Sequence, residues 1–287
     1  MQGERIIKLD DKQLTSFPED ICNNTSLEIL SLYKNKLTKV PECLWDLSKL
    51  RLLNLSVNHL SQVSEKIGKL KNLHTLDLGH NELTSLPSSI GNLENLDSFL
   101  YLSNNQISSL PGSITNLKKL KYLNVTDNQL TSLPGNIGNM ESLVELRLYN
   151  NQLNSLPESI GGLIHLKELH LMNNNLEELP RSLGTMQQLQ ELNLNDNKLV
   201  SLPDTIGNMA KLKYLDLRNN KLEVLPDSIY KLKNLRFLDL RANCLTSISE
   251  RIGELSNLEK FDLRWNNISS MPAGIKGLES KGCVIYY

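Results

Sequence analysis

One side chain recurs in register along most of this chain of 287 residues. Eleven asparagines are spaced by 23 residues, with a single gap of 24, and they are Asn35, Asn58, Asn81, Asn105, Asn128, Asn151, Asn174, Asn197, Asn220, Asn243 and Asn266. Each of the ten prolines follows this position, or its equivalent in the first unit, by six residues. Such a period predicts one supersecondary unit that is copied along the chain and stacks into a solenoid.

The repeated unit combines two kinds of hydrophobic spacing. Leu146 and Leu148 alternate with Glu145, Arg147 and Tyr149, which predicts a short strand with one apolar face. The segment I-G-x-L-x-x-L that precedes it has the spacing of a short helical turn. We expect the asparagine after each strand to point inward and to bond the backbone of neighbouring loops, since its amide both donates and accepts.

This unit, L-P-x-x-I-G followed by the L-x-L strand and the asparagine, resembles the 23-residue leucine-rich repeat of bacterial and Ras-group intracellular proteins. The resemblance extends from Ile6 to about Leu278. It implies an α/β solenoid: a leucine-rich repeat horseshoe with a parallel β-sheet on the concave face and short helical or 3-10 turns on the convex face. We expect a single domain over residues 1–287 with about twelve repeats. Residues 1–22 form an N-terminal cap-like repeat in this prediction, and residues 271–287 form a C-terminal partial repeat with a cap strand.

Two irregularities carry predictions of their own. The 24-residue gap adds one residue near Phe99, which predicts a local bulge just before the strand at Leu100. Near the end of the chain, Val284 and Tyr286 align with the inward-facing positions of a final short strand.

Composition narrows the class of partner and the compartment. The chain has 31 basic and 32 acidic residues, a balance that argues against general nucleic-acid affinity. It shows no apolar run of membrane-spanning length and no secretory signal, so no membrane insertion is expected. The four cysteines lack paired clusters and C-x-x-C spacing, which favours free thiols. We therefore expect a cytoplasmic protein, with delivery into a host cell as an effector as the alternative.

We expect residues that bind a partner on the outward side of the strands, because leucines fill the interior and asparagines fill the turns. The candidate protein-binding residues on this concave face are Tyr33, Phe99, Tyr101, Tyr122, Arg147, Tyr149, His170, Met172, Tyr214, Asp216, Arg218, Phe237, Asp239, Arg241, Asp262, Arg264 and Trp265. Aromatic and arginine side chains dominate the hot spots of protein interfaces, which favours a binding surface.

These residues fall into an aromatic patch around Tyr101, a mixed patch around His170, and a charge ladder. The ladder has one aspartate column and one arginine column, formed by Asp216, Asp239, Asp262, Arg218, Arg241 and Arg264. The alternative to a binding surface is that the two columns neutralise each other and only keep an open face solvated.

One cluster could carry chemistry. Glu168 and His170, with Glu145 and Glu191 nearby, are residue types that ligate metals or exchange protons. We expect them to be exposed on an open sheet without a pocket, however, and open sites rarely support such chemistry. The sequence therefore predicts no catalytic residue, no cofactor and no metal site.

The sequence thus favours a non-enzymatic scaffold for protein–protein interaction, which binds a protein or peptide partner on its concave face. We expect a monomer, with a homodimer as the alternative. The rival hypothesis is a substrate-targeting module of a larger protein or secreted bacterial effector, for example of the ubiquitin-ligase type, whose catalytic domain is absent here. A receptor for a carbohydrate or nucleotide would need a concave pocket.

Overall fold

The structure is a computed structural model that describes residues 3–287. Met1 and Gln2, which belong to the expected cap-like repeat, lie outside the described residues. The chain forms two compact units, residues 1–143 and residues 144–287. Both are built from a short strand and a short helix in alternation, so the α/β solenoid is confirmed, while the single domain over residues 1–287 stays a prediction.

In the first unit, consecutive strands pair in parallel from β1 to β6. The strands are β1 (Ile6–Lys8), β2 (Ile29–Ser31), β3 (Leu52–Asn54), β4 (Thr75–Asp77), β5 (Phe99–Tyr101) and β6 (Tyr122–Asn124). The 3-10 helices between and after them are η1 (Glu19–Asn23), η2 (Glu42–Asp46), η3 (Glu65–Lys69), η4 (Ser88–Asn92), η5 (Gly112–Asn116) and η6 (Ile137–Asn139).

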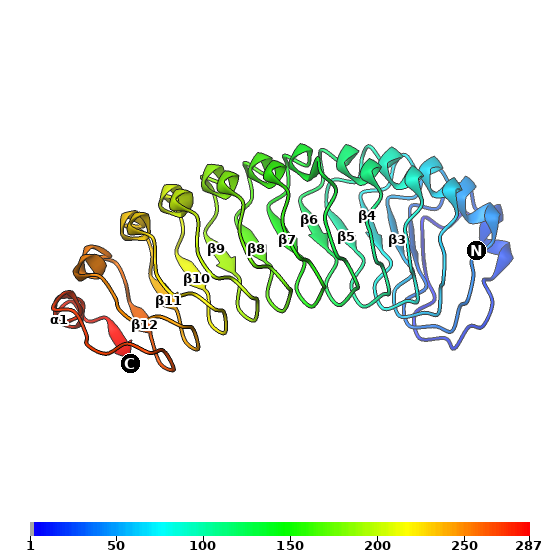
Figure 1. Cartoon of the computed structure of the whole chain (residues 1–287). Coiled ribbons are helices and arrows are strands. Elements are labelled where there is room, and N and C mark those ends of the chain that lie inside the picture. Colours follow the sequence, from blue (N-terminus) through cyan, green and yellow to red (C-terminus); the bar gives the residue numbers. More distant parts are fainter. Residues whose placement is uncertain (1–2) are drawn as a thin grey trace. The chain divides into compact units, whose positions relative to one another are not determined.

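The second unit repeats this plan, with parallel pairing from β7 to β13. Its strands are β7 (Glu145–Arg147), β8 (Glu168–His170), β9 (Glu191–Asn193), β10 (Tyr214–Asp216), β11 (Phe237–Asp239), β12 (Lys260–Asp262) and β13 (Val284–Tyr286). Its helices are the 3-10 helices η7 (Glu158–Gly162), η8 (Arg181–Thr185), η9 (Asp204–Asn208), η10 (Asp227–Lys231) and η11 (Glu250–Glu254), and the α-helix α1 (Gly274–Glu279). Within each unit the strands lie next to one another and the helical turns form a separate row (Figure 1).

The core lies between the strands and the helical turns. Leu146 and Leu148 are fully buried, while Glu145 and Arg147 remain partly accessible, as the alternation predicts. Each repeat also buries the isoleucine or leucine of its helical turn, such as Ile160. Burial of such side chains is worth about 1.5–3 kcal/mol each, and in a solenoid it depends on stacking between neighbouring repeats.

The predicted asparagine ladder is present in the turns. Asn174 donates from Nδ2 to the carbonyl oxygens of Leu148 and Leu171, at 3.0 Å each, and its Oδ1 accepts from the backbone N–H of Leu153 at 3.0 Å. These bonds join the asparagine to its own repeat and to the preceding one. The residue before each asparagine adopts a positive φ, for example 55° at Asn219, which completes the sharp turn.

Glycines in the helical turns allow close contact between repeats. An added Cβ at Gly207 would lie 2.1 Å from the carbonyl oxygen of Ser228 in the next turn. Since real Cβ atoms do not approach a backbone oxygen so closely, the glycine is required by packing between η9 and η10.

The extra residue lies where the sequence places it, immediately before β5. In the neighbouring repeat a single carbonyl, that of Arg51, accepts the N–H groups of both His74 and Thr75. At the insertion the carbonyls of Asp97 and Ser98 each accept one N–H from the following repeat. The strand itself stays in register, with Thr75 opposite Phe99.

The final strand β13 also forms, but the predicted orientation of its side chains is wrong. Ile285 pairs with the buried Phe261, whereas Val284 and Tyr286 are exposed on the other side. The cause is an additional residue between β12 and β13, since Lys260 pairs with Val284 and not with Cys283. A one-residue shift exchanges the two faces of a strand.

The expectation of free thiols is wrong for two of the four cysteines. Cys22 of η1 and Cys43 of η2 form a disulfide, with their Cα atoms 5.7 Å apart. They are 21 residues apart in sequence, so neighbouring helical turns bring the two side chains together although no cysteine cluster is visible in one dimension. Cys244 and Cys283 are free thiols.

No helix within residues 3–287 has the length and apolar character needed to cross a membrane.

Candidate functional site

The accessible side of the strands, here called the strand face, carries the candidate residues in both units. In the first unit Phe99, Tyr101 and Tyr122 come together as predicted and form the aromatic cluster. Their ring centroids are 5.7 Å apart for Phe99 and Tyr101, 5.5 Å for Phe99 and Tyr122, and 5.1 Å for Tyr101 and Tyr122. Phe99 remains 42% exposed, so the cluster presents an apolar surface to solvent.

Tyr33 does not join this cluster, because the strands β3 and β4 separate its position after β2 from β5. It is nevertheless an exposed aromatic side chain. In the second unit, Tyr149 follows β7 and is half-buried. Met172 follows β8 and lines a polar hollow of about 730 Å³ among the asparagine-rich turns.

The charge ladder lies on strands β10, β11 and β12 and the residues that follow them. Asp239 and Asp262 are buried, with 1% and 0% of their surface exposed, so the solvation in the alternative interpretation is wrong for these carboxylates, while its pairing with the arginine column is present. The Arg241 side chain covers them: its Nε lies 2.9 Å from Asp239 Oδ1 and 3.4 Å from Asp262 Oδ2. Nη2 of Arg264 lies 2.6 Å from Oδ2 of Asp262 and forms an ion pair with it. The aspartates thus serve as a buried support that orients the arginines.

Burial and pairing act differently on the carboxylates of Asp262 and Asp216. Burial opposes charge on Asp262, but hydrogen bonds from Arg264 and the nearby charge of Arg241 outweigh it and hold the pKa of Asp262 below its ordinary value. Asp216 has weaker partners, since Arg218 Nε is 3.6 Å away. Burial, together with the negative charge of Asp239, raises the pKa of Asp216 to about 6.

Aromatic side chains flank the ladder and stack on cations. Tyr214 and Phe237 lie with centroids 6.3 Å apart. The Arg264 guanidinium is 4.8 Å from the ring centroid of Tyr286 and 5.5 Å from that of Trp265. Cation–π contacts of this kind contribute about 0.5–1 kcal/mol at exposed sites.

Trp265 combines exposure with an unfavourable backbone conformation. It is 71% exposed and has a φ of 60°, in the left-handed region that bulky side chains avoid. Asparagine or aspartate occupies most equivalent positions, such as Asn219 and Asp196. Trp265 also lines a hollow of about 340 Å³ together with Arg218, Arg241 and the turn residues between them. The contact with Arg264 offsets only part of the backbone strain, which marks the position as a candidate for function.

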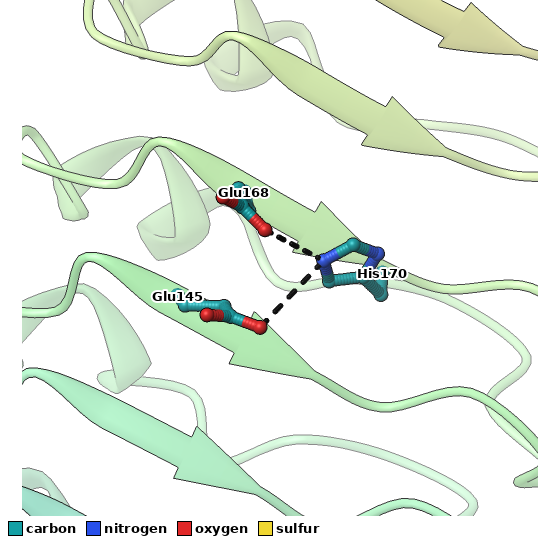
Figure 2. Close-up of side chains that lie close together, drawn as sticks. All are labelled: Glu145, Glu168 and His170. Carbon is teal, nitrogen blue, oxygen red and sulfur yellow. Dashed lines mark hydrogen bonds and ion pairs between the residues drawn. The ribbon is translucent and has the colours of Figure 1, made fainter.

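The mixed patch lies on β7, β8 and β9. His170 Nε2 faces two carboxylates, with Glu168 Oε2 at 3.3 Å and Glu145 Oε1 at 3.9 Å (Figure 2). Arg147 pairs with Glu145, and Asn193 Nδ2 lies 2.9 Å from His170 Nδ1. The expectation that this cluster is open to water is wrong for His170, whose side chain is only 10% exposed, because the neighbouring strands and side chains enclose it.

Comparison with known families fits this architecture. The profile described as a leucine-rich repeat region matches residues 42–118, 82–156 and 99–197. A second leucine-rich repeat profile matches residues 5–60, 187–245 and 211–268. The chain belongs to the leucine-rich repeat family. Its fold is typical of protein–protein interaction scaffolds, and proteins of this family are generally non-catalytic.

Solved structures extend the likeness over the whole chain. A leucine-rich repeat protein of Leptospira interrogans is 36% identical with a TM-score of 0.90, and the match covers 100% of this chain and 73% of that one. The plant peptide hormone receptor RGFR1 in complex with RGF2 is 30% identical with a TM-score of 0.62, over 95% of this chain and 53% of that one. An internalin of Listeria monocytogenes shares the fold, at 24% identity and a TM-score of 0.72, over 98% of this chain and 86% of that one. A comparison with curated proteins gives no significant match.

Proposed function

We propose that the chain is a non-enzymatic scaffold whose strand face binds a protein or peptide. The observation that carries this proposal is Trp265, a large exposed side chain held in an unfavourable conformation beside a hollow and next to Arg264. Tryptophan and arginine are the residue types most enriched at interface hot spots. We therefore place the main contact surface on the second unit, around the ladder and Trp265, with Tyr214 and Phe237 as further contacts.

A second contact surface is proposed at the aromatic cluster of the first unit. Its exposed ring, Phe99, stacks on tyrosines that can also donate hydrogen bonds, a combination suited to protein recognition. The other candidates keep their proposed role as contacts at the edges of these surfaces: Tyr33, Arg147, Tyr149, His170 and Met172.

The likeness to solved receptors supports a peptide-like partner. The plant receptor that this chain resembles is described as a peptide hormone receptor in complex with RGF2. The pairing within the ladder adds a physical constraint. Each ladder aspartate lies beside an arginine, so the surface offers little net charge and would recognise its partner mainly through shape and aromatic contacts.

Affinity capture from a lysate of the source cell, followed by binding measurements on the captured protein, tests this proposal. Alanine at Arg241 or Arg264 is a poor choice of variant, because it would leave buried carboxylates without partners and destabilise the fold. Trp265→Ala and Phe99→Ala remove exposed rings instead. We expect the double variant to lose the captured partner.

The matched control is Ile164→Ala with Val224→Ala, which removes exposed apolar side chains that lie outside the strands. This control should capture as much partner as the wild type. Equal capture by both double variants would contradict a binding site on the strand face.

The compartment and the size of the whole protein belong to the same proposal. The disulfide between Cys22 and Cys43 favours an oxidising environment and counts against the cytoplasmic location expected from the sequence. Delivery into a host cell as an effector, alone or as the targeting module of a larger protein, would at least take the chain through an oxidising environment outside the cell. A reading frame that extends beyond residue 287 into a catalytic domain would support the targeting module. The absence of nucleic-acid binding and the monomeric state stay predictions.

A further inference from the structure

We propose that Glu145, Glu168 and His170 bind a zinc ion on the strand face of the second unit (Figure 2). The proposal goes beyond the protein-binding function and does not depend on it, because it concerns the mixed patch and not the ladder or the aromatic cluster. The ground on which the sequence disfavoured a metal here, exposure to water, does not hold for His170.

The first argument is the placement of the donor atoms. One ligand atom from each residue lies within 4.8 Å of the other two. In a tetrahedral site with zinc–ligand bonds of about 2.0–2.2 Å, ligand atoms lie about 3.3–3.6 Å apart. The separation of His170 Nε2 and Glu168 Oε2 is already 3.3 Å, and that of Nε2 and Glu145 Oε1 is 3.9 Å. Zinc binding then requires Glu145 to move toward His170, and because Glu145 Oε1 is also the atom paired with Arg147, zinc would compete with this ion pair.

The second argument is the charge of the patch. Glu145 pairs with Glu168 across β7 and β8, and Glu168 pairs with Glu191 across β8 and β9, so like charges stand directly opposite each other. Such pairs are unfavourable unless a cation lies between them. Among residues 3–287, Arg147 is the only arginine or lysine with an ion pair to this column. The ladder balances each aspartate with an arginine, whereas this column keeps an excess of negative charge.

The third argument is the fixed position of the histidine ring. His170 is held on β8 with its side chain nine-tenths buried, and Nδ1 accepts a hydrogen bond from Asn193 Nδ2 at 2.9 Å. The ring proton therefore sits on Nε2 and points at the two carboxylates. Zinc would take the place of this proton on Nε2, the ring would carry its proton on Nδ1, and the Asn193 amide would turn to accept it through Oδ1. Histidine ligands are commonly oriented by such a partner.

The donor set selects the metal. One imidazole nitrogen and two carboxylates suit zinc, whereas calcium and magnesium prefer oxygen ligands alone. Three protein ligands leave a fourth position for water. Turning the Asn193 amide breaks its 2.7 Å hydrogen bond to Glu191, so we expect moderate affinity.

Calorimetric titration of the full chain with zinc chloride, after removal of bound metal by a chelator, tests the site. We expect one zinc ion per wild-type chain, no binding at this site in His170→Ala, and affinity at least about tenfold weaker in Glu168→Gln. The Glu168 side chain is 43% exposed, so this variant should keep the fold even if His170→Ala does not.

His74→Ala is the control, since His74 Nδ1 faces a single carboxylate oxygen, Asp97 Oδ1, at 3.0 Å. It should bind zinc like the wild type. A wild-type chain that takes up no zinc, or a Glu168→Gln variant with unchanged affinity, would overturn the proposal.

Discussion

At the scale of single residues, a substitution of Trp265 should change the stability of the fold and the binding of a partner in opposite directions. Its φ of 60° suits asparagine or glycine, and a bulky side chain is strained there. We expect Trp265→Asn to raise the free energy of unfolding by about 0.5–1 kcal/mol, since the relief of strain exceeds the loss of the contact with Arg264. The same substitution should weaken partner binding. Urea denaturation and a binding titration on the same preparation measure the two effects.

Trp265→Phe serves as the control, because it keeps an aromatic side chain and the same backbone conformation. It should leave stability nearly unchanged and keep most of the binding. A destabilised Trp265→Asn variant would show that the tryptophan is structural.

The Asp216 carboxyl predicts a dependence of stability on pH. Its pKa is raised from the model-compound value of 3.8 to about 6 by burial and by the charge of Asp239. The folded state therefore holds this proton more tightly than the unfolded state, and the stabilisation is present below pH 3.8 and lost as pH rises through 6. The loss should be about 1 kcal/mol, because partial exposure screens the effect.

Comparison with Asp216→Asn isolates this group. We expect the two proteins to unfold at similar urea concentrations at pH 4, and the variant to be the more stable one at pH 7, because its neutral amide avoids the cost of a buried charge. A difference between the two proteins that stays constant with pH would contradict the assignment.

The residue scale also shows where sequence reasoning reaches its limit. The inward asparagines and the outward position of Asp239 follow from the repeat, since a strand alternates its faces. The burial of Asp239 and His170 does not, because it arises from neighbouring side chains that fold over an outward-facing group. Alternation tells which side a residue faces, but not whether Arg241 or Asn193 then covers it.

At the scale of the elements, the 3-10 helices are fixed by contacts between repeats. A Cβ at Gly207 would lie 2.1 Å from Ser228 O and could be accommodated only by moving backbone. We therefore expect Gly207→Ala to lower the free energy of unfolding by about 1–3 kcal/mol. Thermal and urea denaturation would measure the change.

Gly277→Ala provides the comparison, since no atom lies within 4 Å of a Cβ built at Gly277 in α1. There alanine should be neutral or stabilise the helix by up to about 1 kcal/mol. Equal effects of the two substitutions would show that helix propensity, and not packing between turns, explains the glycines.

The elements could largely be predicted because one pattern is repeated many times. The strands, the short helical turns and the insertion before β5 all follow from spacing in the sequence. The orientation of β13 could not, because an extra residue before Val284 shifts the register and the sequence Val-Ile-Tyr-Tyr has apolar or aromatic residues at every position. Without a polar residue in alternation, both faces of that strand look equally suited to the core.

At the scale of the molecule, the stability of a stack of repeats is the sum of the stability of each repeat and the contacts between neighbours. Repeats with fewer such contacts unfold more easily. The disulfide between Cys22 and Cys43 joins the first two helical turns of the first unit. It thus adds a covalent link between two neighbouring repeats that otherwise hold together by packing and hydrogen bonds. A crosslink over 21 residues stabilises by about 3 kcal/mol, mainly by restricting the unfolded chain.

We expect Cys22→Ser with Cys43→Ser, or a reducing agent on the wild type, to increase hydrogen exchange in residues 6–54, while residues 144–287 keep their protection. Hydrogen exchange followed by mass spectrometry resolves the two regions. Cys244→Ser is the control, because it removes a free, exposed thiol and should change neither region. Protection lost equally along the chain would mean that the units unfold as one cooperative body, and unchanged protection would mean that packing alone secures the first repeats. Because the crosslink needs an oxidising compartment to persist, local unfolding in the reduced protein would also give the chain a different stability inside and outside the cell.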